Sequence, residues 1–101
     1  MQPHLQFAAL ADPTRCRVVE LLHDRPRPVH ELAGAFSISR PALSRHLRIL
    51  KDAGVVGESR QGRENVYSLK QRTLEQMGEW LAQYWSGRLE ALKAAAEGRT
   101  P

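Results

Sequence analysis

The sequence has a single cysteine, Cys16, so the chain cannot close an internal disulfide, and nothing points to an oxidising compartment. No apolar run approaches the roughly 20 residues that a membrane-spanning helix needs. Residues 1–10 lack the basic flank and apolar stretch of a signal peptide. These absences predict a soluble, cytoplasmic protein with no membrane partner.

The residue patterns of an enzyme are also absent. The sequence contains no glycine-rich phosphate loop, no nucleophile with a plausible base and no paired buried carboxylates. We therefore expect a protein that binds rather than catalyses.

Positive charge is present, and it is concentrated in the middle of the chain. The net charge is +4, but residues 37–72 hold eight basic and three acidic side chains, whereas residues 1–36 hold four of each and residues 73–101 hold three and four. Such a concentration is expected of a phosphate-binding surface. The alternative is a basic face that is merely solvated. The length of 101 residues suits one domain, residues 1–101.

The spacing of apolar residues predicts a mainly α-helical chain with one small β-hairpin. A first helix is expected over about residues 3–11, and a second begins with Asp12 as N-cap and Pro13 in the first turn. A helix–turn–helix is expected over about residues 30–53, and a hairpin over about residues 55–69, with its turn centred on Gln61-Gly62.

The second helix of the helix–turn–helix lies in the segment "SISRPALSRHLRILKDAG". Leu43, Leu47 and Leu50 recur at spacings of four and three, which predicts one buried stripe. Ser39 is a natural N-cap, and Gly54 can end the helix in the left-handed conformation. The opposite face of this helix carries arginine, serine and histidine.

A long terminal helix is expected over about residues 73–96, because apolar residues repeat there at spacings of three and four. So broad a stripe on so small a domain favours packing on a second copy of the chain. The alternative is that the helix folds back on its own core. With the first helix beside it, the expected dimer interface comprises Leu5, Phe7, Leu74, Met77, Leu81, Tyr84, Trp85 and Leu92.

Three segments carry a resemblance to a known family: "FAALADPTRCRVVELL", "VHELAGAFSISRPALSRHLRILKDAGVV" and "GRENVYSL", which span about residues 7–69. Together they resemble the ArsR-type winged helix–turn–helix repressors of bacteria. The resemblance implies a dimeric winged helix–turn–helix fold and a homodimeric, sequence-specific repressor that binds double-stranded operator DNA and acts on its own or a neighbouring operon. Residues 73–96 match only as the terminal amphipathic helix that the family uses for dimerisation.

The chemistry of the polar face fits such a role. Arg40 and Arg45 are the expected contacts to base or groove edges, because arginine can bind guanine bidentately, and Arg48 is expected on phosphate or on a neighbouring side chain. His46 is a DNA contact or a residue at the edge of the core. Arg60 and Arg63 flank the hairpin tip and are expected on phosphate or in the minor groove, unless the tip is only a solubilising turn. The full set of expected DNA contacts is Ser39, Arg40, Pro41, Ser44, Arg45, His46, Arg48, Arg60 and Arg63.

Relatives of this family sense metals, and the resemblance indicates where ligands would lie. The segment "HELAGAF", before the recognition helix, has no cysteine pair, and residues 73–96 have no histidine. We therefore expect no metal and no cofactor, as in the metal-free branch of the family, and the inducer stays unknown. Cys16, on the apolar side of its helix, is expected to be a small core residue.

Two alternatives remain open at this point. A winged helix can serve as a protein-interaction module without DNA, because fold does not fix function. The chain could also be a repressor that senses a small molecule in an intersubunit pocket lined by Trp80, Tyr84 and Trp85, although aromatic stripes of this kind more often form a dimer core.

Overall fold

The computed structural model describes residues 2–98, apart from the side chain of Ser86. Residues 1 and 99–101 of the expected domain lie outside this range. The elements follow one another as α1 (Pro3–Ala9), α2 (Pro13–Asp24), β1 (Arg27–Pro28), α3 (Val29–Ala33), α4 (Arg40–Asp52), β2 (Val56–Gln61), β3 (Glu64–Leu69), α5 (Gln71–Ala82) and α6 (Ser86–Ala96). The prediction of a mainly α-helical fold with a small hairpin is confirmed.

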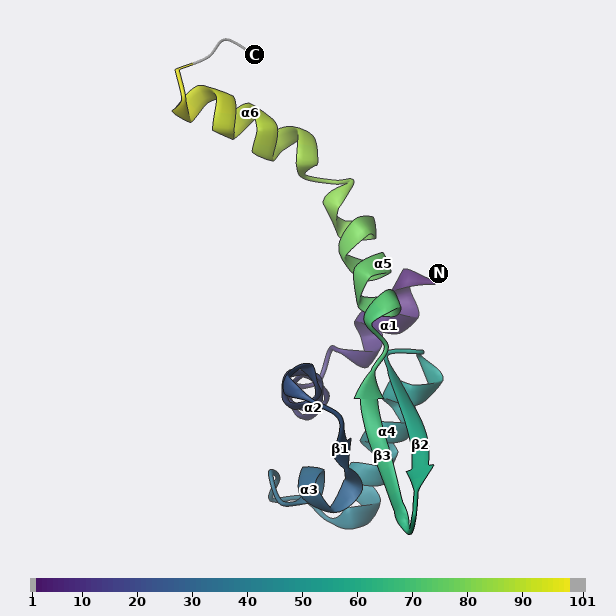
Figure 1. Ribbon diagram of the computed structural model, residues 1–101. Coiled ribbons are helices and arrows are strands. Elements are labelled where there is room, and N and C mark those ends of the chain that lie inside the picture. The colour runs from purple at the N-terminus through teal and green to yellow at the C-terminus, as the bar shows by residue number, and fades with distance from the viewer. Residues whose placement is uncertain (1, 99–101) are drawn as a thin grey trace.

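The core lies where α1, α2 and α4 meet the small sheet (Figure 1). The predicted stripe of α4 is fully buried, since Leu43, Leu47 and Leu50 are at most 1% exposed. Each buried leucine contributes about 1.5–3 kcal/mol relative to an exposed one. Val55 and Val56 continue the core into the base of the hairpin. This packing fixes which side of α4 is left facing solvent.

The predicted caps begin the two principal helices. The Asp12 carboxylate accepts hydrogen bonds from the backbone N–H groups of Thr14 (2.9 Å) and Arg15 (3.2 Å). These bonds, Arg15's above all, lower the pKa of Asp12. The Ser39 hydroxyl accepts from the backbone N–H of Ala42 at 3.2 Å. Gly54 follows α4 with a φ of 77°, the left-handed conformation expected of it.

The sheet contains three strands in the order β1-β3-β2, all antiparallel. The hairpin β2–β3 was predicted, but its turn lies one residue later than expected: Gln61 pairs with Glu64, so Gly62 and Arg63 form the turn. Gly62 has a φ of 64°, as the first central residue of a type II′ turn requires. Strand β1 was not predicted, because two residues that include Pro28 show no alternating pattern.

The prediction of one terminal helix over residues 73–96 is wrong. The structure has two helices, α5 and α6, with a bend between Ala82 and Ser86. The sequence from Tyr84 to Gly87 explains the break, since tyrosine, tryptophan, serine and glycine are all poorer helix formers than alanine or leucine. Figure 1 shows α6 running away from the rest of the chain. The longest extent is therefore 60 Å, and the radius of gyration is 17.6 Å, against about 13 Å for a compact domain of this length.

The apolar stripe of the terminal segment divides at the bend. Met77 is 5% exposed and Leu74 packs against the core. Both residues therefore pack within their own chain, as expected if this part of the terminal segment folds back on its own core. By contrast, Tyr84, Trp85, Leu89 and Leu92 are exposed, Leu92 to 67%. None of the helices between residues 2 and 98 combines the length and the hydropathy that a membrane crossing requires.

Helix α1 packs against both α4 and α5. The Gln6 amide is buried and donates to the backbone oxygen of Ala53 at 2.7 Å. Phe7 meets Trp80 with ring centroids 5.5 Å apart, and Trp80 meets Tyr84 at 5.0 Å. Leu5 remains exposed on the outer side of α1. Trp80 of α5 and Tyr84 of the bend after it therefore already make aromatic contacts within their own chain.

Candidate nucleic-acid interface

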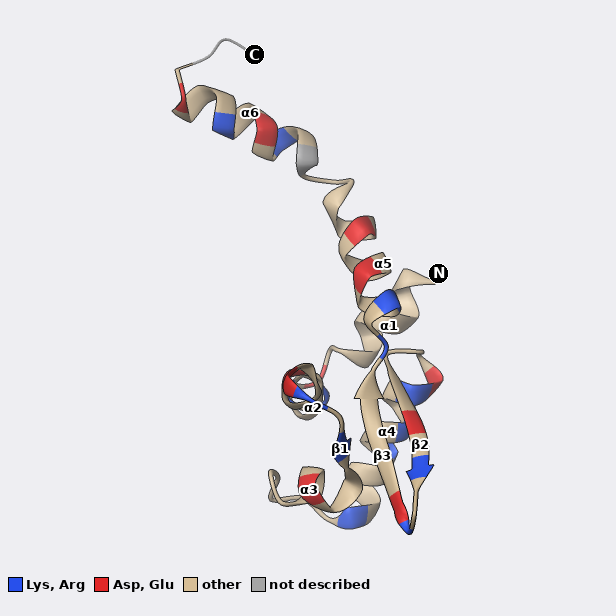
Figure 2. Ribbon diagram, viewed as in Figure 1, with Lys and Arg blue, Asp and Glu red and all other residues tan. Residues whose placement is uncertain are grey.

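The solvent side of α4 carries a dense set of cationic and hydroxyl groups. Burial of the leucine stripe turns the other positions of the helix outward, because residues three and four apart share a face. Figure 2 shows Lys and Arg along α4 and at the hairpin tip. The exposed members of the predicted set on this helix and its cap are Ser39, Arg40, Pro41, Ser44, Arg45 and Arg48.

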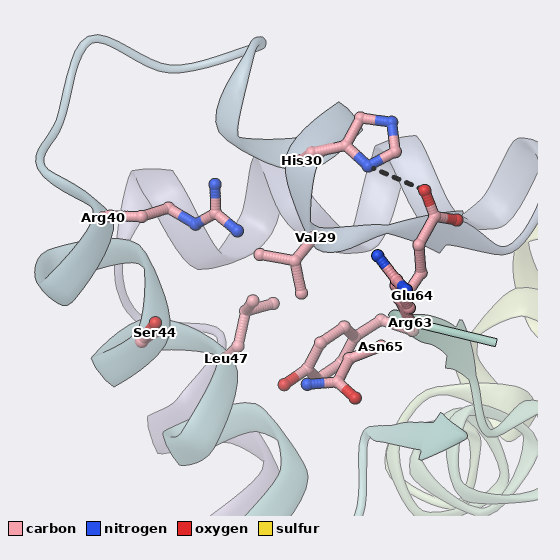
Figure 3. A pocket seen from close by; sticks show the side chains of 9 residues that line it. Val29, His30, Arg40, Ser44, Leu47, Arg63, Glu64 and Asn65 are labelled. Carbon is pink, nitrogen blue, oxygen red and sulfur yellow. Dashed lines mark ion pairs between the residues drawn. The ribbon is translucent and has the colours of Figure 1, made fainter. Parts of the chain in front are cut away.

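A groove of about 280 Å³ separates α4 from the β2–β3 hairpin. Arg40 and Ser44 line it from the helix, and Arg63, Asn65 and Tyr67 line it from the hairpin. Figure 3 shows the Arg40 side chain extending from its helix across this groove. The structure therefore brings two of the predicted arginines, one from each element, to the same surface.

A second groove of about 340 Å³ continues past Ser44 and Tyr67 toward the end of α4. Arg48 lines it, and its guanidinium lies 3.7 Å from the Asp52 carboxylate with both side chains mostly exposed. Exposed pairs of this kind contribute little to stability, about 0–1 kcal/mol. Arg48 is therefore available to a phosphate at small cost.

His46 lies apart from this surface. Its Nδ1 is 3.1 Å from Nη1 of Arg15 and 3.8 Å from the Asp12 carboxylate, and its side chain is only 22% exposed. Arg15 in turn donates to the backbone oxygen of Ala9 at 2.6 Å. The structure places His46 at the edge of the core, between α4 and the start of α2, and a DNA contact by His46 stays a prediction.

The two hairpin arginines differ in what they contact. Arg60 donates to the backbone oxygen of Gly62 (3.1 Å) and to the side-chain oxygen of Asn65 (3.4 Å), so it braces the hairpin tip. Arg63, in the turn itself, is exposed beside the groove. Arg63 is the hairpin cation best placed to meet a ligand.

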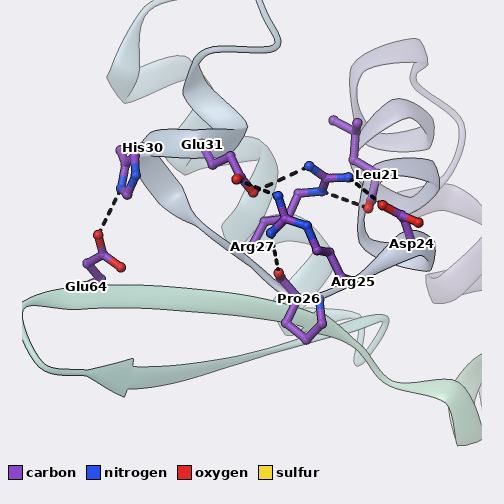
Figure 4. Close-up of polar contacts among 8 residues, drawn as sticks. All are labelled: Leu21, Asp24, Arg25, Pro26, Arg27, His30, Glu31 and Glu64. Atoms are coloured by element: carbon purple, nitrogen blue, oxygen red, sulfur yellow. Dashed lines mark hydrogen bonds and ion pairs between the residues drawn. The ribbon is translucent and has the colours of Figure 1, made fainter.

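The first helix of the helix–turn–helix is held by ion pairs that the sequence did not reveal. Glu31 on α3 accepts from Arg25 at 2.6 Å and from Arg27 at 3.4 Å (Figure 4). Arg27 also donates to the backbone oxygen of Leu21 (2.9 Å) and to Asp24 (3.2 Å). The hydrogen bond from Arg25 is the main cause of the lowered pKa of Glu31. These contacts join α3 to the end of α2.

A second polar link joins the hairpin to α4. Glu58 on β2 accepts from the Lys51 ammonium and from the Tyr67 hydroxyl, each at 2.9 Å. Both bonds lower the pKa of Glu58, that from Lys51 more. Burial, followed by the hydrogen bond to Glu58, raises the pKa of Tyr67 to about 12. No pattern in the sequence had singled out Glu58.

The described residues do not include a group of three or more His, Cys, Asp or Glu side chains that could hold a metal ion. Cys16 is half-buried, and its thiol lies 2.8 Å from the backbone oxygen of Leu10.

Sequence comparisons relate this chain to known bacterial regulators. The model of the family described as "Bacterial regulatory protein, arsR family" matches residues 12–58. The transcriptional repressor SdpR of Bacillus subtilis (strain 168) is 36% identical over 78 residues, which cover 77% of this chain and 87% of SdpR.

Solved structures share the fold. The crystal structure of the ArsR family transcriptional regulator RHA00566 has a TM-score of 0.80 at 32% identity, over 85% of this chain and 94% of that chain. The homodimeric winged helix–turn–helix DNA-binding domain Mb0332 of Mycobacterium bovis (fragment 1–100), a possible ArsR-family regulator, has a TM-score of 0.62 at 23% identity. That match covers 97% of this chain and 84% of the other, and it concerns the fold alone.

The family model covers α2, the helix–turn–helix and the first residues of β2, and SdpR is matched along most of its length. This chain therefore belongs to the arsR family of bacterial regulatory proteins, which are winged helix–turn–helix transcriptional regulators and not enzymes.

Proposed function

We propose that the chain is a homodimeric repressor that binds double-stranded operator DNA in the cytoplasm and regulates its own or a neighbouring operon. The observation that carries this proposal is the solvent face of α4, where Arg45 is exposed and where Arg40 and Ser44 line the groove that Arg63 also lines. A helix of this kind fits the major groove, and arginine reads guanine O6 and N7 there. The hairpin then lies over the adjacent backbone as the wing.

Dimerisation follows from the exposed apolar residues. Tyr84, Trp85, Leu89 and Leu92 gather on α6 and the bend before it, where the chain itself leaves them uncovered. A second copy would cover them, and with the exposed Leu5 and the half-buried Leu81 they form the proposed interface. A dimer would also hold two recognition helices about 34–36 Å apart, the repeat of successive major grooves on one side of the duplex. Mb0332, which shares the fold, is a homodimer.

The salt dependence of binding to random-sequence duplex tests this proposal. If a dimer neutralises about six phosphates, the logarithm of the binding constant should fall with the logarithm of salt concentration at a slope of about −5. Fluorescence anisotropy of a labelled duplex between low and physiological salt gives the slope. A flat response would contradict an interface dominated by phosphates, whereas no measurable binding at low salt would favour an interaction module that does not bind DNA.

A further inference from the structure

Glu58 places a carboxylate beside the cationic solvent side of α4, the surface proposed to bind phosphates. It lines the groove that also holds Ser44 and Arg48, and its side chain is 23% exposed. Both of its oxygens are engaged, Oε1 by the Lys51 ammonium and Oε2 by the Tyr67 hydroxyl. The three side chains come from the last turn of α4, from β2 and from β3. One carboxylate thus joins the recognition helix to both strands of the wing.

The outer half of β2 has few contacts of its own, whereas β3 is held at Val66 and Tyr67 by its pairing with β1 and by the burial of Tyr67. In β2 only Val56 is buried, and every residue from Glu58 to the tip has an exposed surface. Within residues 2–98, the polar side-chain contacts from the hairpin to α3 or α4 are Glu58 with Lys51 and Glu64 with His30. The second contact spans 3.2 Å between side chains that are half or more exposed, so it constrains the wing less.

We propose that Glu58 is a positioning residue for DNA recognition, holding the wing against α4 and thereby setting the separation between Arg63 and the arginines of the recognition helix. This inference rests on the proposed function. Rigid placement matters because a phosphate or groove-edge contact from Arg63 and a base contact from Arg40 must be made together on one duplex. A wing whose outer half can shift would lose that simultaneous fit while keeping its charge.

The sign of the effect separates positioning from simple electrostatics. Glu58→Gln removes one negative charge per protomer from the neighbourhood of the DNA, so charge alone would raise affinity for every duplex. Loss of the wing's anchor would instead lower affinity for the operator and leave binding to random sequence unchanged or slightly stronger. The two accounts therefore predict opposite changes in operator binding.

The experiment compares Glu58→Gln, Tyr67→Phe and the double variant with the unaltered chain on two probes, a duplex recovered from randomised DNA by that chain and a random-sequence duplex. Operator affinity should fall about tenfold for Glu58→Gln and about threefold for Tyr67→Phe, as expected for loss of hydrogen bonds to a charged group. The double variant should lose no more than Glu58→Gln alone, because the Tyr67 hydroxyl acts through the Glu58 carboxylate. Glu20→Gln, which removes the same charge from an exposed pair with Arg17 on α2, should change neither probe's affinity.

Thermal unfolding of each variant shows whether the fold is destabilised. If Glu58→Gln is destabilised, Tyr67→Phe replaces it in the comparison, because that substitution keeps the buried ring. Unchanged or tighter operator binding by both variants would overturn the inference and leave the proposed function intact. Equal losses on both probes would also overturn it, because they would mean a general structural role. Failure of the unaltered chain to bind either duplex would instead remove the proposed function, and this inference with it.

Discussion

Arg45→Ala is expected to weaken binding to the operator by about 2–6 kcal/mol per dimer, because a bidentate contact to guanine discriminates by about 1–3 kcal/mol and each substitution acts in both protomers. Arg45 is exposed on the solvent side of α4, the side that would face the base edges when the helix lies in the DNA major groove. Arg40→Ala should behave in the same way. Affinity for random duplex should fall far less, since each variant removes only one cation per protomer.

Two further arginine variants serve as controls for Arg40→Ala and Arg45→Ala. Arg63→Ala should weaken operator and random duplex about equally, because a contact from the wing tip to phosphate carries no base information. Arg17→Ala, which removes a cation paired with Glu20 on α2, should leave both affinities nearly unchanged. Titration of all four variants against both duplexes is the measurement. Equal losses on both duplexes for Arg40, Arg45 and Arg63 would show that α4 does not read bases.

Leu92→Glu is expected to convert the dimer into a folded monomer. Leu92 is 67% exposed within one chain, so the substitution leaves the chain's own core untouched. At a two-fold interface, however, it removes about 1.5–3 kcal/mol of burial from each protomer and places two unpaired carboxylates where apolar surface should meet. Leu81 is a poorer choice, because it is already half-buried in its own chain. Operator binding should fall with the dimer.

Gly87→Glu provides the control for that experiment. Gly87 lies about 140° around α6 from Leu92, since five positions amount to one full turn of the helix and about 140° more. A side chain added there meets nothing within 4 Å. Sedimentation equilibrium should find Gly87→Glu dimeric and Leu92→Glu monomeric. A Leu92→Glu dimer of normal affinity for the operator would place the interface elsewhere on the chain.

The recognition helix could be predicted from the sequence because its signals are local. The leucine stripe of α4 follows the helical period, and Ser39 and Gly54 mark its two ends with residues whose chemistry suits those positions. Once the stripe is buried, the exposed positions follow by geometry, and so the outward placement of Arg40 and Arg45 was predicted too. Strand β1 could not be found in this way, because its pairing with β3 depends on tertiary contact alone.

The wing link was missed for a reason that lies in the hairpin register. A turn centred on Gln61-Gly62 would set Glu58 opposite Asn65, whereas the true turn sets it opposite Tyr67, whose hydroxyl it binds. An error of one residue in the turn therefore changed every cross-strand neighbour by two positions.

The prediction of one helix over residues 73–96 was wrong for a similar reason. Apolar spacing runs across the bend between α5 and α6 without a break, so periodicity predicted one helix. The weak helix formers from Tyr84 to Gly87 were the only local signal of the interruption. His46 was undecided because nothing local to α4 indicated its contacts with Arg15 and Asp12, which come from α2 and its cap.

Two copies of α4, held at a fixed separation by the dimer, are expected to read one duplex. Selection of bound fragments from randomised DNA by the purified chain, followed by sequencing, tests it most directly. We expect an inverted repeat whose half-sites lie one helical turn apart, about 10–10.5 base pairs from centre to centre, or a multiple of that spacing. Fragments with no enriched sequence, or with a single half-site that lacks an inverted partner, would contradict it.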